Sequence, residues 1–209
     1  MTPHPIGDLL AAAARGRFPE PDGSVEVVPP WLPNVEGVVS LTGRAYVATT
    51  RPAADVLAHR PDGFGGAVDP RFVSWLAGPN GWCDCLDVLL MAAGTGAGGP
   101  PARPALADHY RVRHARLVRA GVVVHGDGRG LITLGAGVGG LPEIGVELTE
   151  PAHRRGAGRS LIGDALGLVE AGAPVVAAVA PGNARALRAF LAAGFVPVGS
   201  VHLVRPQAG

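Results

Sequence analysis

The chain contains 209 residues, of which 47% are hydrophobic and 17% charged, and its formal net charge at pH 7 is +1. All 18 residues counted as Lys or Arg are arginine. The absence of lysine excludes a Walker-type phosphate loop, Schiff-base chemistry and a lysine-anchored pyridoxal phosphate. The small net charge argues against a nucleic-acid partner. The apolar content suffices to bury a core, and the length suits one large domain or two small ones.

The sequence contains no apolar run of about 18 residues, and residues 1–18 lack the basic-then-apolar order of a signal peptide. We therefore expect no membrane partner and a cytoplasmic location. Cys83 and Cys85 lack the second ligand pair of a zinc site, so no metal is predicted and both are expected to be buried. His114, set among arginines, is expected on a solvated helix face.

The N-terminal half predicts short helices and strands followed by a linker. In chain order these are a helix at 8–15, strands at 25–28 and within 37–49, helices at 53–59 and 71–77, and an apolar run at 82–93 that fits either a strand or a helix. Residues 94–104 are dense in Gly and Pro and are typical of a long loop or linker. No internal repeat is apparent.

The C-terminal half has clearer periodicity. It predicts a helix at 106–119, a hairpin whose strands at 121–125 and 131–134 flank a turn, a strand at 141–148, a helix at 156–172 and a buried strand at 175–180. A further helix is predicted after Asn183, which is a good N-cap, and it ends at Gly194. Two short strands, 195–198 and 201–204, close the chain. The order of elements indicates an α/β or α+β protein.

A Gly- and Arg-rich stretch, residues 153–160 (HRRGAGRS), joins the predicted strand at 141–148 to the following helix. Such a turn presents backbone N–H groups at a helix N-terminus, where the helix dipole favours an anion such as a phosphate. The alternative is an ordinary strand-to-helix loop with solvated arginines. Two other glycine clusters, 94–99 and 135–140, are not followed by a helix and do not predict a dinucleotide site.

This stretch resembles the GNAT superfamily of N-acetyltransferases, whose members carry Gln/Arg-x-x-Gly-x-Gly/Ala between the fourth strand and the third helix. Here the pattern is His153-x-x-Gly156-x-Gly158. It is followed at the right spacing by residues 183–195 (NARALRAFLAAGF), which resemble the family's Asn-x-x-Ala-x-x-x-Tyr-x-x-x-Gly-Phe pattern. The resemblance covers 141–205 well, 106–140 loosely and 1–105 not at all.

The resemblance implies a mixed central sheet flanked by helices. It also implies a domain at 106–209 that binds acetyl-CoA. We expect the α+β extension at 1–105 to provide acceptor specificity, because the cofactor half has no spare length for it. The implied cofactor-binding residues are Leu148, His153, Arg154, Arg155, Gly156, Ala157, Gly158, Arg159, Ser160, Asn183 and Phe190. Phe190 stands where many members have a tyrosine that protonates the departing thiolate, so water or another side chain would serve here.

Glu143 and Glu147 lie on one face of the predicted strand at 141–148. Because an acidic residue near this place often acts as the base in the family, the resemblance implies that one of them accepts the amine proton. The alternative is that each faces solvent or pairs with an arginine.

The expected activity is transfer of an acetyl group from acetyl-CoA to an amine by direct attack in a ternary complex. The amine could belong to an antibiotic, a polyamine, an amino acid or a protein N-terminus, so the partner is a small-molecule or peptide acceptor, and a homodimer is possible. The alternatives are a non-catalytic acyl-CoA-binding regulatory module and a scaffold for protein interaction.

Overall fold

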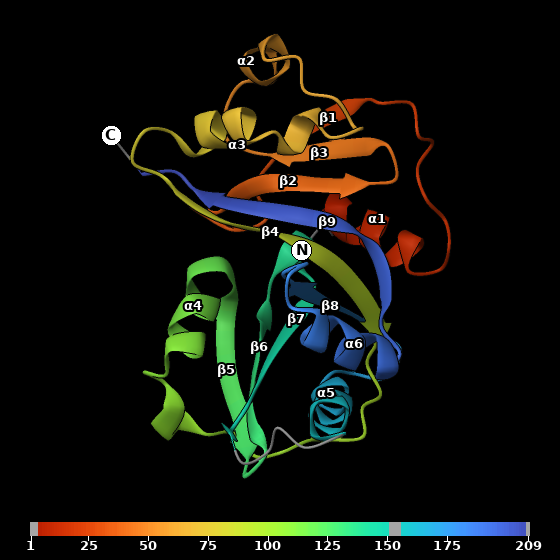
Figure 1. Cartoon of the computed structure of the whole chain (residues 1–209), viewed down its shortest axis with the longest axis vertical. Helices are drawn as coiled ribbons and strands as arrows, with labels where there is room; N and C mark the ends of the chain where they lie inside the picture. The colour runs from red at the N-terminus through yellow and green to blue at the C-terminus, as the bar shows by residue number, and fades with distance from the viewer. Residues whose placement is uncertain (1–3, 151–155, 208–209) are drawn as a thin grey trace.

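A computed structural model describes residues 4–150 and 156–207 as six α-helices and one nine-stranded mixed sheet (Figure 1). The sheet order is β1-β3-β2-β9-β4-β8-β7-β6-β5. The strands are β1 (Val25–Val28), β2 (Glu36–Leu41), β3 (Arg44–Ala48), β4 (Trp82–Ala93), β5 (Ala120–Asp127), β6 (Gly130–Ala136), β7 (Pro142–Leu148), β8 (Pro174–Val179) and β9 (Val196–Arg205). The helices are α1 (Pro5–Ala13), α2 (Ala53–Ala58), α3 (Pro70–Ala77), α4 (Tyr110–Val118), α5 (Ala157–Gly167) and α6 (Ala184–Ala192).

The chain is therefore an α+β protein, and the predicted hairpin, helices and buried strand are confirmed. No helix within the described residues is long and apolar enough to cross a membrane. The prediction of two closing strands is wrong, because residues 196–205 form the single strand β9. Gly199 and Ser200 lie between the two predicted strands, but Ser200 pairs with Ser40 on one side and Val88 on the other. A Cβ at Gly199 would lie 2.2 Å from the Ser40 carbonyl oxygen, so glycine lets β2 approach closely.

The apolar run at 82–93 forms β4, which lies in the centre of the sheet between β8 and β9 and is antiparallel to both. Leu89 and Met91 contribute to the core on one face, and Leu90 contributes to the core on the other. This two-sided burial explains why the run shows no polar alternation. The division expected after residue 105 stays a prediction, and the sheet is continuous across that point.

Helices cover both faces of the sheet (Figure 1). On one face, α1 packs Ile6 and Leu10 into a core that also includes Val118 of α4. On the opposite face, α5 and α6 pack against β7 and β8 through Leu161, Ile162 and other apolar side chains, while α3 covers the strands contributed by the N-terminal half. The alternation of side chains along β7 and β8 thus separates an α4 face from an α5/α6 face.

Candidate functional site

A cleft opens between β7 and β8, which run parallel but pair only at Glu143 and Val176. Beyond that pair, the cleft is lined by Gly145 and Val146 of β7 and by residues 178–180 at the end of β8, and its volume is about 350 Å³. Diverging parallel strands leave backbone N–H and C=O groups without ladder partners. Such groups can bond an extended ligand that carries amides.

The cleft reaches both faces of the sheet. Its lining includes Tyr110, His114 and Arg119 from the α4 side together with Asn183 and Phe190 from the α6 side. Two ligands could therefore approach the same gap from opposite faces, which is the arrangement that a direct transfer between them needs.

The N-terminus of α5 lies at the carboxyl end of β7. Gly156 is its N-cap with a φ of 91°, a left-handed conformation that favours glycine, and no side chain among the described residues caps the helix. The first intrahelical bond runs from the Ser160 N–H to the Gly156 carbonyl at 2.9 Å. The N–H groups of the preceding first-turn residues therefore remain available to an anion.

The predicted anion-binding stretch is only partly described. Ala157, Gly158, Arg159 and Ser160 form the first turn of α5, whereas His153, Arg154 and Arg155 lie outside the described residues. Gly158 lies close to the end of β7, because a Cβ there would be 3.7 Å from Leu148 Cδ1 and 3.5 Å from Ala189 Cβ.

Arg129 is a basic residue near this helix terminus that the sequence analysis missed. It follows the β5–β6 turn, and its Nη1 donates to the Ser160 hydroxyl at 2.6 Å. The Asp127 and Asp164 carboxylates pair with the same guanidinium and hold it in place. The hydrogen bond from Arg129 also holds the pKa of Asp127 below its ordinary value. The sequence offered only the hairpin turn as a signal, because the contact joins residues 31 apart.

The prediction of Asn183 as an N-cap is confirmed: its side-chain oxygen accepts the Ala186 N–H at 3.1 Å. Asn183 also lines the cleft, as does Phe190. The Phe190 ring is 4% exposed and packs edge-on against Phe195, with 5.0 Å between ring centroids. Phe190 thus belongs to the core and presents an apolar wall to the cleft.

The two glutamates of β7 each pair with an arginine. Glu143 is 2% exposed; its Oε1 accepts from Nε of Arg119 at 2.7 Å and forms an ion pair with Nη2 at 2.6 Å. Glu147 accepts from Nε of Arg111 at 2.9 Å. The arginine pairing that the sequence analysis left open is therefore present at both positions. Their assignment as proton acceptors stays a prediction.

A second group of polar side chains enters the cleft from β4. Between Cys83 and Leu86 the pairing with β9 shifts by one residue, which is a β-bulge that re-aims side chains. Asp84, Cys85 and Asp87 line the cleft here. The Asp84 Oδ2 lies 3.6 Å from Nε2 of His114, and the Cys85 thiol donates to Asp87 Oδ1 at 3.1 Å.

These contacts correct two expectations. Cys83 and Cys85 are exposed rather than buried, because the first part of β4 extends past the core. His114 is on the cleft side of α4, half-buried against Trp82, with 6.0 Å between ring centroids. Partial burial, followed by the Asp87 carboxylate, raises the pKa of Cys85 to about 12, so this thiol stays protonated at neutral pH.

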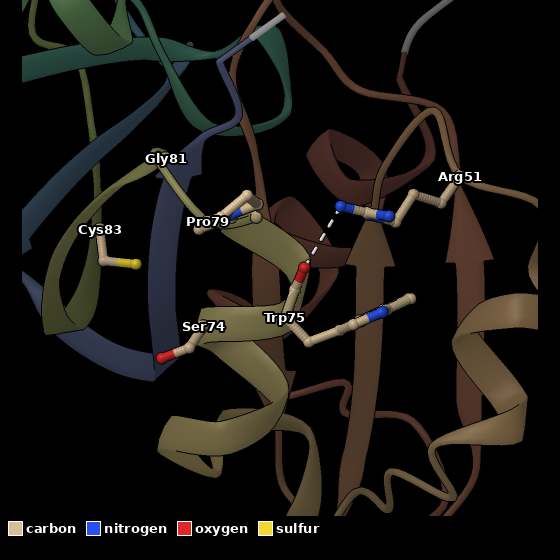
Figure 2. A pocket seen from close by; sticks show the side chains of 8 residues that line it. Arg51, Ser74, Trp75, Pro79, Gly81 and Cys83 are labelled. Atoms are coloured by element: carbon tan, nitrogen blue, oxygen red, sulfur yellow. Dashed lines mark hydrogen bonds between the residues drawn. The ribbon is translucent and has the colours of Figure 1, made fainter. Parts of the chain in front are cut away.

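A larger pocket of about 680 Å³ lies at the C-terminus of α3 (Figure 2). Its charged residue, Arg51, donates from Nη2 to the carbonyl oxygens of Trp75 and Leu76 at 3.2 and 3.3 Å and stacks over the Trp75 ring at 4.6 Å. Arg51 therefore caps the end of α3, which is a structural role. The groups suited to proton transfer gather in the cleft between β7 and β8 instead.

A scan against protein-family models finds no match to this chain, and a search of curated proteins also finds none. In residues 4–150 and 156–207, no three His, Cys, Asp or Glu side chains are grouped so as to hold a metal ion. The case for a function therefore depends on the cleft and on the two sequence patterns beside it.

Proposed function

We propose that the chain is an N-acetyltransferase of the GNAT type, which transfers the acetyl group of acetyl-CoA to an amine. The observation that carries the proposal is the cleft between the diverging parallel strands β7 and β8, with a helix N-terminus following each strand. The start of α5 at Gly156 and the Asn183-capped helix α6 support the proposal, because they carry the described parts of the two sequence patterns.

The proposed binding follows from the free backbone groups. The pyrophosphate would accept hydrogen bonds from the first-turn N–H groups of α5, starting after Gly156. The extended, amide-containing pantetheine arm of acetyl-CoA would lie between β7 and β8, with Phe190 as an apolar wall. This arrangement brings the thioester into the gap, where a backbone N–H of β7 can stabilise the oxyanion that forms on attack.

Phe190 cannot protonate the departing thiolate. A thiol with an ordinary pKa of about 8.5 is a fair leaving group without a proton donor, so water suffices. The absence of a tyrosine hydroxyl at Phe190 favours the alternative, a non-catalytic acyl-CoA-binding module. Release of free CoA in the presence of an amine, followed by mass spectrometry, separates the two, because a pure binding module would release none.

The test of the cofactor site uses thermal unfolding with and without acetyl-CoA. A ligand present at 100 times its Kd stabilises the fold by about 2.7 kcal/mol, so the wild type should unfold at a higher temperature. Gly158→Asp should abolish that shift because it places a carboxylate in the first turn of α5, where the phosphates would bind, while its Cβ would make only ordinary contacts, 3.5 Å from Ala189 Cβ and 3.7 Å from Leu148 Cδ1.

Gly163→Asp is the matched control. Gly163 lies in the same helix, is exposed, and has nothing within 4 Å of its Cβ position, so the variant adds the same charge away from the terminus. It should keep the acetyl-CoA shift. Loss of the shift in both variants, or in neither, would contradict the anion site, and no shift in the wild type would contradict acetyl-CoA as the ligand.

A further inference from the structure

The α4 side of the cleft carries an excess of negative charge. The two arginines that line it, Arg111 and Arg119, are each paired with a glutamate of β7. Two carboxylates then remain: Asp84 in the bulged part of β4, and Asp87 just after it, paired with Val201 of β9. Asp84 has His114 beside it. Among the described residues, Asp87 forms no salt bridge.

Asp87 is half-buried on this side of the cleft. Burial first, and then the neighbouring Asp84 and Glu143 carboxylates, raise the pKa of Asp87, while the Cys85 thiol and His114 lower it. An ionised carboxylate in this position is poorly solvated and is stabilised by a cation that enters the cleft. The site therefore complements a positively charged group on the ligand.

Resting on the proposed acetyl transfer, we propose that the acceptor is a cationic primary amine with no carboxylate beside its amino group. Asp87 binds the ammonium group, and His114, whose Nε2 lies 3.6 Å from the Asp84 carboxylate, accepts its proton. Imidazole is suited to this step because a neutral ring nitrogen can accept a proton. The Asp84 carboxylate beside the ring then stabilises the imidazolium that forms.

The reaction balances with acetyl-CoA as the acyl donor. The ammonium group gives one proton to His114, and the neutral nitrogen attacks the thioester carbonyl carbon. A C–N bond forms as the C–S bond breaks, and the CoA thiolate leaves. The amide nitrogen then loses its second proton, so the products are the N-acetyl amine, CoA thiol and one net proton released to solvent.

The exclusion of a carboxylate follows from the same charges. An α-amino acid would bring its carboxylate against Asp84 and Asp87, and like charges at close range repel. Binding it would need an unengaged arginine, and both arginines that line the described cleft already hold a glutamate. Of the acceptors that the sequence left open, simple amines and polyamines fit this site, whereas amino acids do not.

Cadaverine and lysine form a matched pair of test substrates, because they differ only by the carboxylate. In an assay that reads the acetylated product by fragment mass spectrometry, cadaverine should have a kcat/KM at least tenfold above that for acetylation of lysine at its α-amino group. Asp87→Asn should raise the KM for cadaverine about tenfold or more, as expected for loss of a charged hydrogen bond. His114→Gln should lower kcat by about 10²-fold or more with little change in KM. Asp55→Asn, an exposed site on α2, is the control and should change neither.

Calorimetric titration of cadaverine, with and without CoA, tests the amine site independently of acetyl transfer. Binding that is lost in Asp87→Asn supports the site even if the acetyl-CoA thermal shift fails. No binding by the wild type in either condition, or equal binding by Asp87→Asn, overturns the proposal. So does acetylation of the lysine α-amino group at the rate found for cadaverine, even where the acetyl-CoA shift is present and the proposed function stands.

Discussion

The buried pair of Glu143 and Arg119 allows a sharp prediction about stability. The Glu143 side chain is 3% exposed and that of Arg119 is 10% exposed. The second carboxylate oxygen of Glu143 accepts the Val138 N–H at 3.1 Å, and Arg119 also donates to the Thr133 hydroxyl at 3.1 Å. Glu143→Ala therefore leaves a buried guanidinium without its counter-charge and a buried N–H without its acceptor.

Removing one partner of a buried ion pair costs about 3–5 kcal/mol, and an unsatisfied buried donor costs about 1–3 kcal/mol. The two effects overlap because one carboxylate satisfies both groups, so we expect a loss of about 4 kcal/mol in the free energy of unfolding. The double variant Glu143→Leu with Arg119→Met removes both charges. It should be more stable than Glu143→Ala, since no unpaired charge remains in the core.

Urea unfolding followed by circular dichroism at pH 7 measures these differences. A loss below about 1 kcal/mol for Glu143→Ala, or a double variant no more stable than the single one, would refute the reasoning. Glu143→Gln also tests the role left open by the sequence. If this variant binds acetyl-CoA and transfers the acetyl group at the wild-type rate, Glu143 supports β7 and does not accept the proton.

Three further predictions concern β4 and α6. Because burial raises the pKa of Asp87, the folded state holds its proton more tightly than the unfolded chain, so ionisation lowers stability. Asp87→Asn should therefore raise the free energy of unfolding at pH 7, and the gain should vanish as the pH falls toward the ordinary value of 3.8. Asn183→Ala should lower stability by about 1 kcal/mol through loss of the cap, measured by urea unfolding. Cys85, with its pKa raised to about 12, should react slowly with iodoacetamide at pH 7 and faster in Asp87→Asn, as mass spectrometry can follow; equal rates would contradict the contact.

The features that could be predicted from the sequence are those that interactions between neighbouring residues determine. The N-cap at Asn183, the hairpin of β5 and β6 and the glycine-rich start of α5 depend on neighbouring residues, and the structure contains all three. The proposed acceptor side was missed because it depends on contacts between distant segments. The His202 ring, for example, hydrogen-bonds the Asp84 carbonyl across 118 residues at 3.0 Å. No periodicity in residues 82–93 reveals that they pair with β8 and β9.

The same pairing bears on how the cleft is held open. Parallel strands that diverge lose ladder bonds, so β7 and β8 need support from elsewhere. β8 is paired along its whole length with β4, from Val88 opposite Val179 to Ala93 opposite Pro174. β7 is paired with β6 and fixed by the buried ion pair of Glu143. The N-terminal half thus supplies one of the two supports of the proposed site.

A fragment of residues 106–209 tests this dependence. Without β4, the apolar edges of β8 and β9 become exposed, and exposed apolar edge strands promote aggregation. We expect the fragment to be insoluble or unfolded by circular dichroism and to show no acetyl-CoA thermal shift, while co-expression with residues 1–105 should restore a soluble complex. A monomeric, folded fragment that binds acetyl-CoA would show instead that the C-terminal half is an independent domain, as the sequence resemblance alone implies.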